Sequence, residues 1–245
     1  MQYGGLNMIR VTIYNEFYHE QNNEKVKAVY PNGIHSVIAD FLKADDITVK
    51  CVTLETVEEL TEEALKETDV LIWWGHVGHA KVPDEVAVRV RDAVLTGMGF
   101  IGLHSAHHSQ PFKLLMGTSC HLGWREHGDM ERIWNINPAH PITQGIGRYF
   151  ELPHVETYAE PFGIPNPDEV IFMGWYEGGE LFRSGCTFHR ENGRIFYFQP
   201  GHETYPIFHD PNVQTIIKNA VRWAAPVYRS EALVCPNIKK IGSEN

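Results

Sequence analysis

Cysteine is scarce in this sequence, and the few that occur lie far apart. They are Cys51, Cys120, Cys186 and Cys235, and their spacing shows no pattern of paired metal ligands or disulfides. Without such a pattern, a disulfide framework of the kind found in secreted proteins is not expected. Reduced thiols are typical of the cytoplasm, so we expect a cytoplasmic protein.

The sequence also has fewer positively charged than negatively charged residues and lacks long apolar runs. The chain has 21 Lys and Arg residues against 31 Asp and Glu residues, which gives a formal net charge of -10. An acidic surface repels phosphate backbones, so we expect no nucleic-acid partner. No stretch reaches the apolar length of a membrane span, and residues 1–8 lack the basic start and apolar run of a signal peptide. A small neutral ligand such as a sugar is compatible with this charge.

The first half of the chain alternates between strand and helix patterns. The patterns predict strands at 9–14, 47–54, 70–74 and 100–103, and helices at 31–44, 61–67 and 83–97. This alternation indicates an α/β protein with a doubly wound, mainly parallel sheet covered by helices on both faces. Ligands of such sheets bind beyond the carboxyl ends of the strands, near a topological switch point.

The second half has a different pattern. It predicts strands at 130–135, 170–176, 180–188 and 194–199, a hairpin turn at Asn192-Gly193 and a final helix at 213–224. We interpret these strands as an antiparallel extension of the same sheet. No linker divides the chain, so we expect a single domain at 9–225 followed by a C-terminal tail at 226–245.

The tail carries apolar side chains that have no obvious place in a single-domain core. They are Val227, Tyr228, Leu233 and Val234. Apolar groups outside a core are typical of surfaces that meet another protein. We therefore expect a homo-oligomer, in which the tail covers a neighbouring subunit or a sheet edge.

Three histidine clusters follow predicted strands. They are His76 and His79 after 70–74, His104 and His107 after 100–103, and His202 with Glu203 after 194–199. Parallel strands carry their carboxyl ends to one edge of the sheet. We therefore expect His76, His104 and His202 to converge on one pocket, with the other three residues in or near it.

Two kinds of chemistry suit such a pocket. Neutral imidazoles bind zinc-like metals, and three of them leave a coordination position open for water. The candidate ligands of Zn²⁺ or another divalent metal are His76, His79, His104 and His202. Without a metal, a histidine held by Glu203 or Glu156 could act as a general base near neutral pH. The sequence leaves both alternatives open.

A serine mechanism is a further alternative. The segment from Gly102 to Ala106 resembles the strand-to-helix elbow that holds a nucleophile, and His202 with Glu203 could activate its Ser105. A full hydrolase elbow has glycine two residues before and two after the serine, whereas this sequence has Leu103 and His107 there. The catalytic candidates are His104, His202, Glu203 and, for a hydrolase, Ser105.

Five residues are candidates for binding a substrate. They are Trp74, His107, Trp124, Arg125 and Glu156. Trp124 and Arg125 combine an aromatic plane with a charge, which suits sugar hydroxyls. Glu156 shares one face of an extended segment with His154. The alternative for Trp124 and Arg125 is a packed tryptophan beside a surface salt bridge.

Several longer strings make the sequence similar to a known family. They are WWGHVGH, GMGFIGLHSAHHS, LMGTSC, WRE, HPIT, ETYAEPFGIP, FRSGC and YFQPGHETYP, in a match that runs from Ile9 to Ala225. By these strings the chain resembles the ThuA-like family of trehalose utilisation. The resemblance implies the flavodoxin-like fold of class I glutamine amidotransferases, which carry a cysteine nucleophile at an elbow and a late histidine–glutamate pair. This sequence has His104 and Ser105 at the elbow, so the fold is implied but thiol amidotransferase chemistry is not.

The resemblance also implies a class of function. It implies metabolism of trehalose-type disaccharides, including oxidised keto-sugars, by an isomerase- or hydrolase-type enzyme with a small-molecule sugar substrate. Gln110 stands where the family has lysine, and if that lysine matters to function, the substrate of this member differs. The alternative is a non-catalytic sugar-binding or regulatory protein on an amidotransferase-like scaffold, because a fold alone does not establish catalysis.

Overall fold

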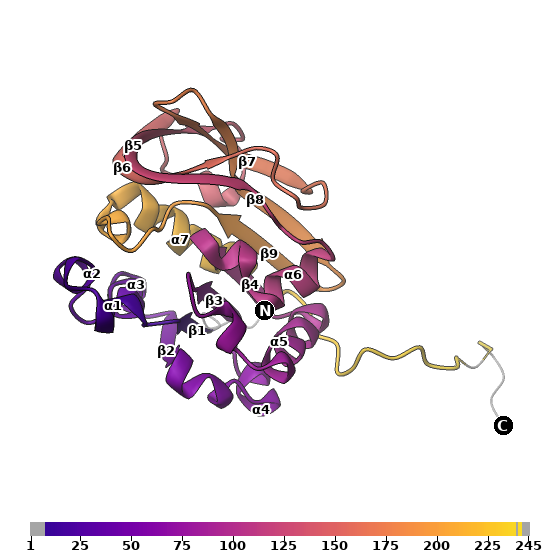
Figure 1. Cartoon of the computed structure of the whole chain (residues 1–245). Helices are drawn as coiled ribbons and strands as arrows, with labels where there is room; N and C mark the ends of the chain where they lie inside the picture. The colour runs from indigo at the N-terminus through magenta and orange to yellow at the C-terminus, as the bar shows by residue number, and fades with distance from the viewer. Residues whose placement is uncertain (1–7, 239, 242–245) are drawn as a thin grey trace.

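One mixed sheet of nine strands forms the centre of the molecule (Figure 1). The computed structural model of the chain describes residues 8–238, 240 and 241. The strands are β1 (Ile9–Asn15), β2 (Ile47–Thr53), β3 (Val70–Trp74), β4 (Gly99–Leu103), β5 (Gly123–Asn135), β6 (Tyr149–Ala159), β7 (Glu169–Tyr176), β8 (Leu181–Arg190) and β9 (Gly193–Phe198). Their order across the sheet is β2-β1-β3-β4-β9-β8-β7-β5-β6.

The strands β2, β1, β3, β4 and β9 are parallel and form one half of the sheet. Every residue of β3 and β4 is buried, as their unbroken apolar runs predict for strands covered on both faces. The register pairs Trp74 with Leu103 and Leu103 with Phe198, so neighbouring strands end side by side. The loops that follow β3, β4 and β9 therefore leave the sheet at one edge.

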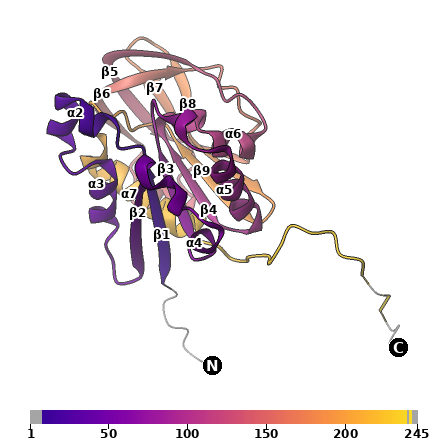
Figure 2. The same cartoon turned by 60° about the horizontal axis from the view of Figure 1, so that its bottom comes forward.

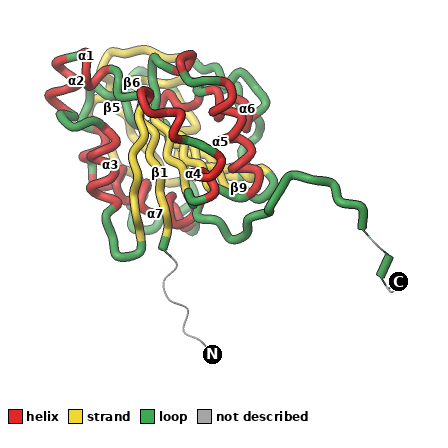
Figure 3. Tube along the Cα trace, turned by 90° about the horizontal axis from the view of Figure 1, so that it is seen from below, coloured by secondary structure: helices red, strands yellow, loops and turns green. Residues whose placement is uncertain are grey.

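Helices cover both faces of the parallel half (Figures 2 and 3). They are α1 (His19–Asn22), α2 (Glu24–Val29), α3 (Ile34–Leu42), α4 (Glu62–Lys66), α5 (Asp84–Thr96), α6 (Gln110–Met116) and α7 (Pro211–Ala224). The helices α3 and α7 contact each other on one face, while α4, α5 and α6 form a row on the other. Gly99 lets α7 approach the sheet closely, because a side chain there would meet the carbonyl oxygen of Ala224.

The strands β8, β7, β5 and β6 extend the sheet in antiparallel pairing. β9 belongs to both halves, because it is parallel to β4 and forms a hairpin with β8. Four of the eight pairings between the described strands are parallel, so the expectation of a mainly parallel sheet is correct only for the first half. No strand is predicted at β6, where Pro153 interrupts the pattern. An edge strand tolerates proline because one of its sides has no partner.

Several elements differ from the predictions: β5 begins at Gly123, seven residues before the predicted strand, and α6 has no predicted counterpart. The helix predicted from residue 31 begins at Ile34, because Gly33 adopts a φ of 84° directly before it. The β8–β9 hairpin turns at Glu191-Asn192, one residue earlier than predicted. Residues 15–25, for which no element is predicted, contain α1, which carries His19 to the edge of the sheet where β3 and β9 end.

The cysteines and the helices bear on the expected cellular location. All four cysteines are free thiols, two of them buried and two exposed. Within the described residues, no helix has the length and apolar character needed to cross a membrane. The expected absence of a signal peptide concerns residues 1–8, of which 1–7 lie outside the described part of the chain, and the cytoplasmic location stays a prediction.

Glu131 is an acidic side chain buried in the antiparallel half. It lies on β5, where Ser184 donates a 2.8 Å hydrogen bond to one of its carboxyl oxygens while the other oxygen has no partner. Burial raises the pKa of Glu131 to about 8 from an ordinary value of 4.5. The native protein therefore keeps a proton on Glu131 over a pH range in which the unfolded chain does not.

This buried acid predicts a pH-dependent stability that Glu131→Gln removes. Because the pKa is raised in the folded state, the stability is fully present below about pH 4.5 and is lost as the pH rises through about 8. The free energy of unfolding of the wild type should fall relative to the variant by up to about 1.4 kcal/mol per pH unit in this window. Urea unfolding at about pH 5 and about pH 8 measures the difference, with Glu151→Gln on β6 as an exposed control. Equal pH slopes for the wild type and Glu131→Gln would contradict this prediction.

Candidate functional site

The loops after β3, β4 and β9 bring three histidine rings together. The ring centroids of His76 and His104 lie 5.8 Å apart, and the centroid of His202 lies 5.0 Å from the first and 5.4 Å from the second. The three strands are neighbours that end side by side, so their loops share one edge of the sheet. The structure thus brings together the three histidines for which the sequence predicts a common pocket.

His104 begins the short 3-10 turn η3 (His104–His108) directly after β4. Its φ of 54° is a left-handed backbone conformation that is rare outside glycine and turns the chain sharply out of the sheet. Its ring is fully buried, and Nδ1 lies 2.9 Å from the carbonyl oxygen of Gln199. A carbonyl oxygen only accepts, so Nδ1 donates this hydrogen bond, and Nε2 lies 3.5 Å from the hydroxyl of Tyr158.

Glu203 fixes the orientation of His76 from the loop after β9. One oxygen of Glu203 accepts hydrogen bonds from Nδ1 of His76 at 2.8 Å and from Nδ1 of His19 at 2.5 Å. Burial alone would raise the pKa of Glu203, but these two hydrogen bonds outweigh it and hold the pKa well below its usual value. The carboxylate is therefore ionised, and Nε2 is the free nitrogen of His76.

Glu156 on β6 is in direct contact with His104. Its Oε2 atom lies 3.0 Å from Nε2 of His104, yet it is buried and has no partner with hydrogen-bond geometry. Burial alone would raise the pKa of Glu156, but the contact with His104 outweighs it and lowers the pKa. A carboxylate and a nitrogen lone pair this close repel each other unless a proton or a metal ion lies between them.

His202 completes the group from the loop after β9. Its Nδ1 atom lies 2.8 Å from the hydroxyl of Thr204, and burial lowers its pKa to about 4, so the ring is neutral near pH 7. One ligand atom from each of His76, His104, Glu156 and His202 lies within 4.8 Å of the others. Three imidazoles and one carboxylate are donors that zinc accepts in proteins.

This set differs from the predicted metal ligands in one member. Glu156 takes the place of His79, which lies in the 3-10 turn η2 (His79–Lys81). The loop after β3 carries the His79 ring past the pocket, to 5.8 Å from the ring of His108. Burial lowers the pKa of His79 to about 3, so its ring is neutral.

Ser105 is not arranged as a nucleophile. Its hydroxyl is buried and lies 2.9 Å from the hydroxyl of Tyr158 on β6. Among the hydrogen bonds of the described residues, none joins Ser105 to His202. Burial raises the pKa of Tyr158 well above its usual value, so its phenol stays protonated and cannot act as the base. The geometry therefore does not support the serine mechanism.

His107 and Trp74 support the loops around the pocket. Nδ1 of His107 donates a 2.7 Å hydrogen bond to the carbonyl oxygen of Cys120, and burial lowers the pKa of this histidine to about 3. Trp74 is buried, and its indole N–H donates a 2.9 Å hydrogen bond to the carbonyl oxygen of Gly201. Both side chains, predicted to bind substrate, are used to hold backbone carbonyls in place.

Trp124 and Arg125 lie on opposite faces of β5. Trp124 is opposite Tyr158 in the β5–β6 pairing, so both side chains project from the face that carries the pocket. Trp124 is 68% exposed and is free to stack on a ligand. Arg125 points from the other face, where Asp129 and Glu180 bind its guanidinium group. Of this predicted pair, only Trp124 lies on the same face of the sheet as Tyr158.

Two residues of the site are missing from the sequence analysis. His19 follows β1, the strand next to β3, so the positional rule used for the other histidines could have found it. The hydrogen bond to Glu203 is the main reason why the pKa of His19 is raised. Gln199 contributes a backbone carbonyl oxygen to His104, and no side-chain pattern marks such a role.

Solved structures with a similar fold are known. One, described as ThuA-like and from Bacteroides uniformis, has a TM-score of 0.63 and 18% identity over 91% of this chain and 94% of its own. Another, described in the same way and from Parabacteroides merdae, has a TM-score of 0.68 and 15% identity over 93% of each chain. A glutamine amidotransferase from Thermotoga maritima has a TM-score of 0.54 and 10% identity over 89% of this chain and 98% of its own. At these identities the likeness concerns the fold alone.

A family model covers the chain from its first strand to its last helix. The model is ThuA, described as trehalose utilisation, and it matches residues 10–224. A search of curated proteins found no match to the sequence. Because the family model covers most of the sequence, and structures described as ThuA-like share the fold, this chain belongs to the ThuA family.

Proposed function

We propose that the chain is an enzyme of sugar metabolism that holds a divalent metal ion, with zinc as the first choice. The ligands would be His76, His104, Glu156 and His202. The observation that carries the proposal is the buried Oε2 atom of Glu156, which has no hydrogen-bond partner and lies 3.0 Å from Nε2 of His104, the ring nitrogen that Gln199 does not hold. The second nitrogens of His76 and His104 are held by Glu203 and Gln199, as is usual for histidines that bind metals.

The metal and the side chains of the protein would have different roles in the reaction. A metal at this position would polarise a sugar carbonyl or lower the pKa of a water molecule. The chain orients the pocket through the fixed rings of His76 and His104. His19, which is partly exposed and bound to Glu203 through Nδ1, would transfer a proton to or from the substrate. This combination suits isomerisation or hydrolysis of a keto-sugar.

The charges around the pocket favour a neutral sugar over a phosphorylated one. Glu156 and Glu203 are ionised, and a carboxylate oxygen of Glu126 lies 3.8 Å from His202. Arg125, the predicted cation, is turned away from the pocket. An exposed tryptophan such as Trp124 offers a plane on which a sugar ring stacks. We therefore expect a neutral disaccharide of the trehalose type, or its keto derivative.

Metal analysis of the purified protein, paired with a substrate screen, tests this function. We expect about one divalent ion per chain, and a melting temperature that falls when a chelator removes it. Turnover should occur with neutral disaccharides or keto-sugars, and kcat/KM should be at least about tenfold lower for the matching sugar phosphates because of charge repulsion. Full activity of metal-free protein would contradict the metal site. A preference for phosphorylated sugars would contradict the substrate class.

Sugar binding without catalysis is a second candidate function. His104 and His107 each donate a hydrogen bond to a backbone carbonyl, as histidines with purely structural roles do. A binding protein of this kind would take up sugar in calorimetry, with no metal and no product. The same purified protein distinguishes the two functions, because only the enzyme would convert the bound sugar.

A further inference from the structure

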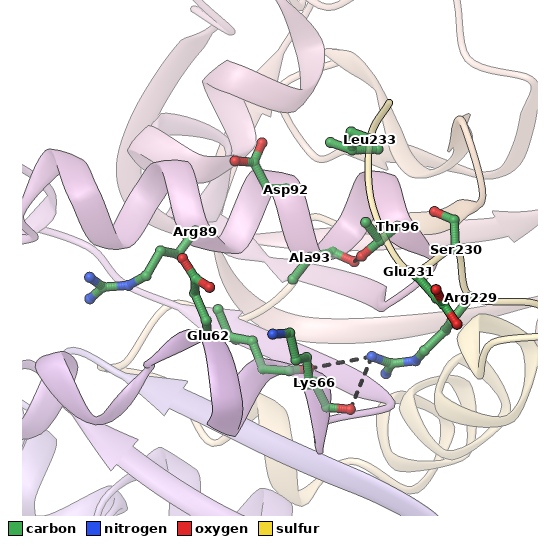
Figure 4. A pocket seen from close by; sticks show the side chains of 11 residues that line it. Glu62, Lys66, Arg89, Asp92, Ala93, Thr96, Arg229, Ser230, Glu231 and Leu233 are labelled. Atoms are coloured by element: carbon green, nitrogen blue, oxygen red, sulfur yellow. Dashed lines mark hydrogen bonds between the residues drawn. The ribbon is translucent and has the colours of Figure 1, made fainter. Parts of the chain in front are cut away.

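A groove of about 590 Å³ between α4 and α5 lies away from the histidines (Figure 4). It borders the end of α5 at Thr96, just before β4 begins, whereas His104 follows the end of β4. Four residues of the chain's own tail line it: Arg229, Ser230, Glu231 and Leu233. Its lining has as many basic as acidic side chains, so the groove holds the start of the tail and selects no charge. The homo-oligomer expected from the tail stays a prediction.

Glu126 on β5 lies beside the histidine cluster but outside the proposed set of metal ligands. One of its carboxylate oxygens lies 3.8 Å from Nε2 of His202, and its side chain is 45% exposed. Thr204 holds Nδ1 of His202 through its hydroxyl and its backbone N–H, so Nε2 is the nitrogen left for a metal. A carboxylate this close to a ligand atom is within reach of a water molecule or a sugar oxygen that enters the pocket.

A β-bulge directs Glu126 toward the pocket. The pairing of β5 with β6 shifts its register between Arg125 and Asp129, so Glu126 lies in the irregular stretch. Gly128 in this stretch has a φ of 73°, and a Cβ atom there would lie 3.2 Å from the hydroxyl of Tyr205. Bulges change the direction of a side chain and are common next to active sites. The backbone therefore departs from regular pairing where it presents this carboxylate.

The charged groups around Glu126 leave its carboxylate available. The neighbouring cation Arg125 points from the other face of β5, where Asp129 and Glu180 bind it. Among the ion pairs of the described residues, Glu126 takes part only in the contact with His202. A half-exposed carboxylate without a cationic partner can accept a proton from a molecule in the pocket and release it to solvent.

We propose that Glu126 is a catalytic general base, which removes a proton from the water molecule that cleaves the glycosidic bond of a neutral disaccharide or its keto derivative. The proposal rests on the proposed function. As Glu126 takes the proton, the water oxygen bonds to the anomeric carbon. The bond from this carbon to the leaving sugar oxygen breaks, its electron pair stays on that oxygen, and His19 donates a proton there. Glu126 then releases its proton to solvent and His19 regains one, so the reaction consumes only water.

Glu126 and His19 reach the pocket from different halves of the sheet. His19 follows β1, and its ring lies 5.5 Å from the ring of His76, whereas Glu126 on β5 contacts His202. In the order of strands, β1 lies on one side of β3, β4 and β9, and β5 lies on the other. An acid and a base that flank the scissile bond are what hydrolysis of a glycoside requires.

Kinetics and binding measurements on Glu126→Gln test this role. Glutamine keeps the size of the side chain but cannot take up the proton, so kcat should fall at least about a hundredfold. The dissociation constant of the sugar, measured by calorimetry, and the metal affinity should stay within a few-fold of the wild type. Glu151→Gln, at an exposed carboxylate of β6 that binds Arg132, is the matched control and should keep wild-type turnover. Unchanged kcat in Glu126→Gln, or a loss of metal or sugar affinity that accounts for its lower turnover, would overturn the proposal.

Rescue by formate distinguishes a base from a structural group. Because Glu126 is half-exposed, a small carboxylate can enter the space that Glu126→Ala leaves. Formate should raise the turnover of Glu126→Ala at least about tenfold, because it supplies the missing base. It should not raise the turnover of Glu126→Gln, in which the amide still fills the space. A Glu126→Ala variant that formate does not accelerate would contradict the proposal.

Product analysis in water labelled with oxygen-18 separates this proposal from the proposed function. Hydrolysis by the wild type should give separate monosaccharides, one of which carries the label. If the wild type isomerises the sugar without cleaving it, the proposed function stands but the role of Glu126 in activating water is wrong. A wild type that binds no metal and converts no sugar would contradict both.

Discussion

Replacing His104 with asparagine is expected to abolish turnover and metal binding while the protein stays folded. The amide of asparagine can still donate a hydrogen bond to the carbonyl oxygen of Gln199, and asparagine tolerates the left-handed backbone at this position. It has no counterpart of Nε2, the nitrogen that faces Glu156. We expect kcat to fall on the order of a thousandfold, as measured with the substrate found in the screen.

Alanine at the same position is expected to affect stability as well as activity. Although His104 lies in a loop after β4, its ring is fully buried. His104→Ala would leave a cavity, lose the hydrogen bond to Gln199 and cost about 2–4 kcal/mol of unfolding free energy. His108→Asn, an exposed change in the same turn, is the control and should have little effect. Unchanged turnover in a folded His104→Asn variant would exclude a catalytic role for this ring.

Replacing Glu156 with glutamine is expected to weaken metal binding strongly, because the substitution removes a negative charge. Glu156→Gln keeps the shape of the side chain, but a neutral amide binds a divalent cation far less well than a carboxylate does. We expect the metal affinity to fall about a hundredfold or more, measured by competition with a chelator. At a metal concentration well above both dissociation constants, a hundredfold loss lowers the stabilisation by metal by about 2.7 kcal/mol. The melting temperature of the loaded variant should fall accordingly.

Two other glutamates serve as controls for this experiment. Glu203→Gln removes a group that orients His76 without belonging to the four-residue ligand set, so a smaller loss of about 10- to 100-fold is expected. Glu126→Gln changes a half-exposed carboxylate near His202 and should leave the metal affinity within a few-fold of the wild type. If Glu156→Gln binds metal as tightly as the wild type, a proton and not a metal ion separates Glu156 from His104.

Much of the parallel half could be predicted from local patterns. Strands covered on both faces consist of continuous apolar runs, and β3 and β4 have such sequences. The order of strands and helices along the chain then implies which ends of the strands meet. For this reason the convergence of His76, His104 and His202 follows from the sequence alone, although their spacing along the chain is wide.

The predictions were poorer where a residue's role depends on a distant partner. The sequence predicts Glu156 as a partner of a histidine but not of which one, because Glu156 lies on an edge strand whose pattern Pro153 interrupts and His104 follows a distant strand. Arg125 turns away from the pocket because successive side chains of β5 point to opposite faces, and the position of β5 in the sheet decides which face is which. The substrate role predicted for Arg125 therefore has no support in the geometry.

The sequence by itself determined that the chain is an α/β protein with histidines at the carboxyl ends of its strands. Strand and helix patterns depend on neighbours in the chain, and a family match depends on strings of such neighbours. Only the tertiary structure decided which nitrogen of each histidine is free, because the partners that hold the rings lie far away in the sequence. Gln199 is 95 residues from His104, and Glu203 is 127 residues from His76. Contacts over such separations arise from the packing of the whole sheet. Local sequence patterns do not predict them.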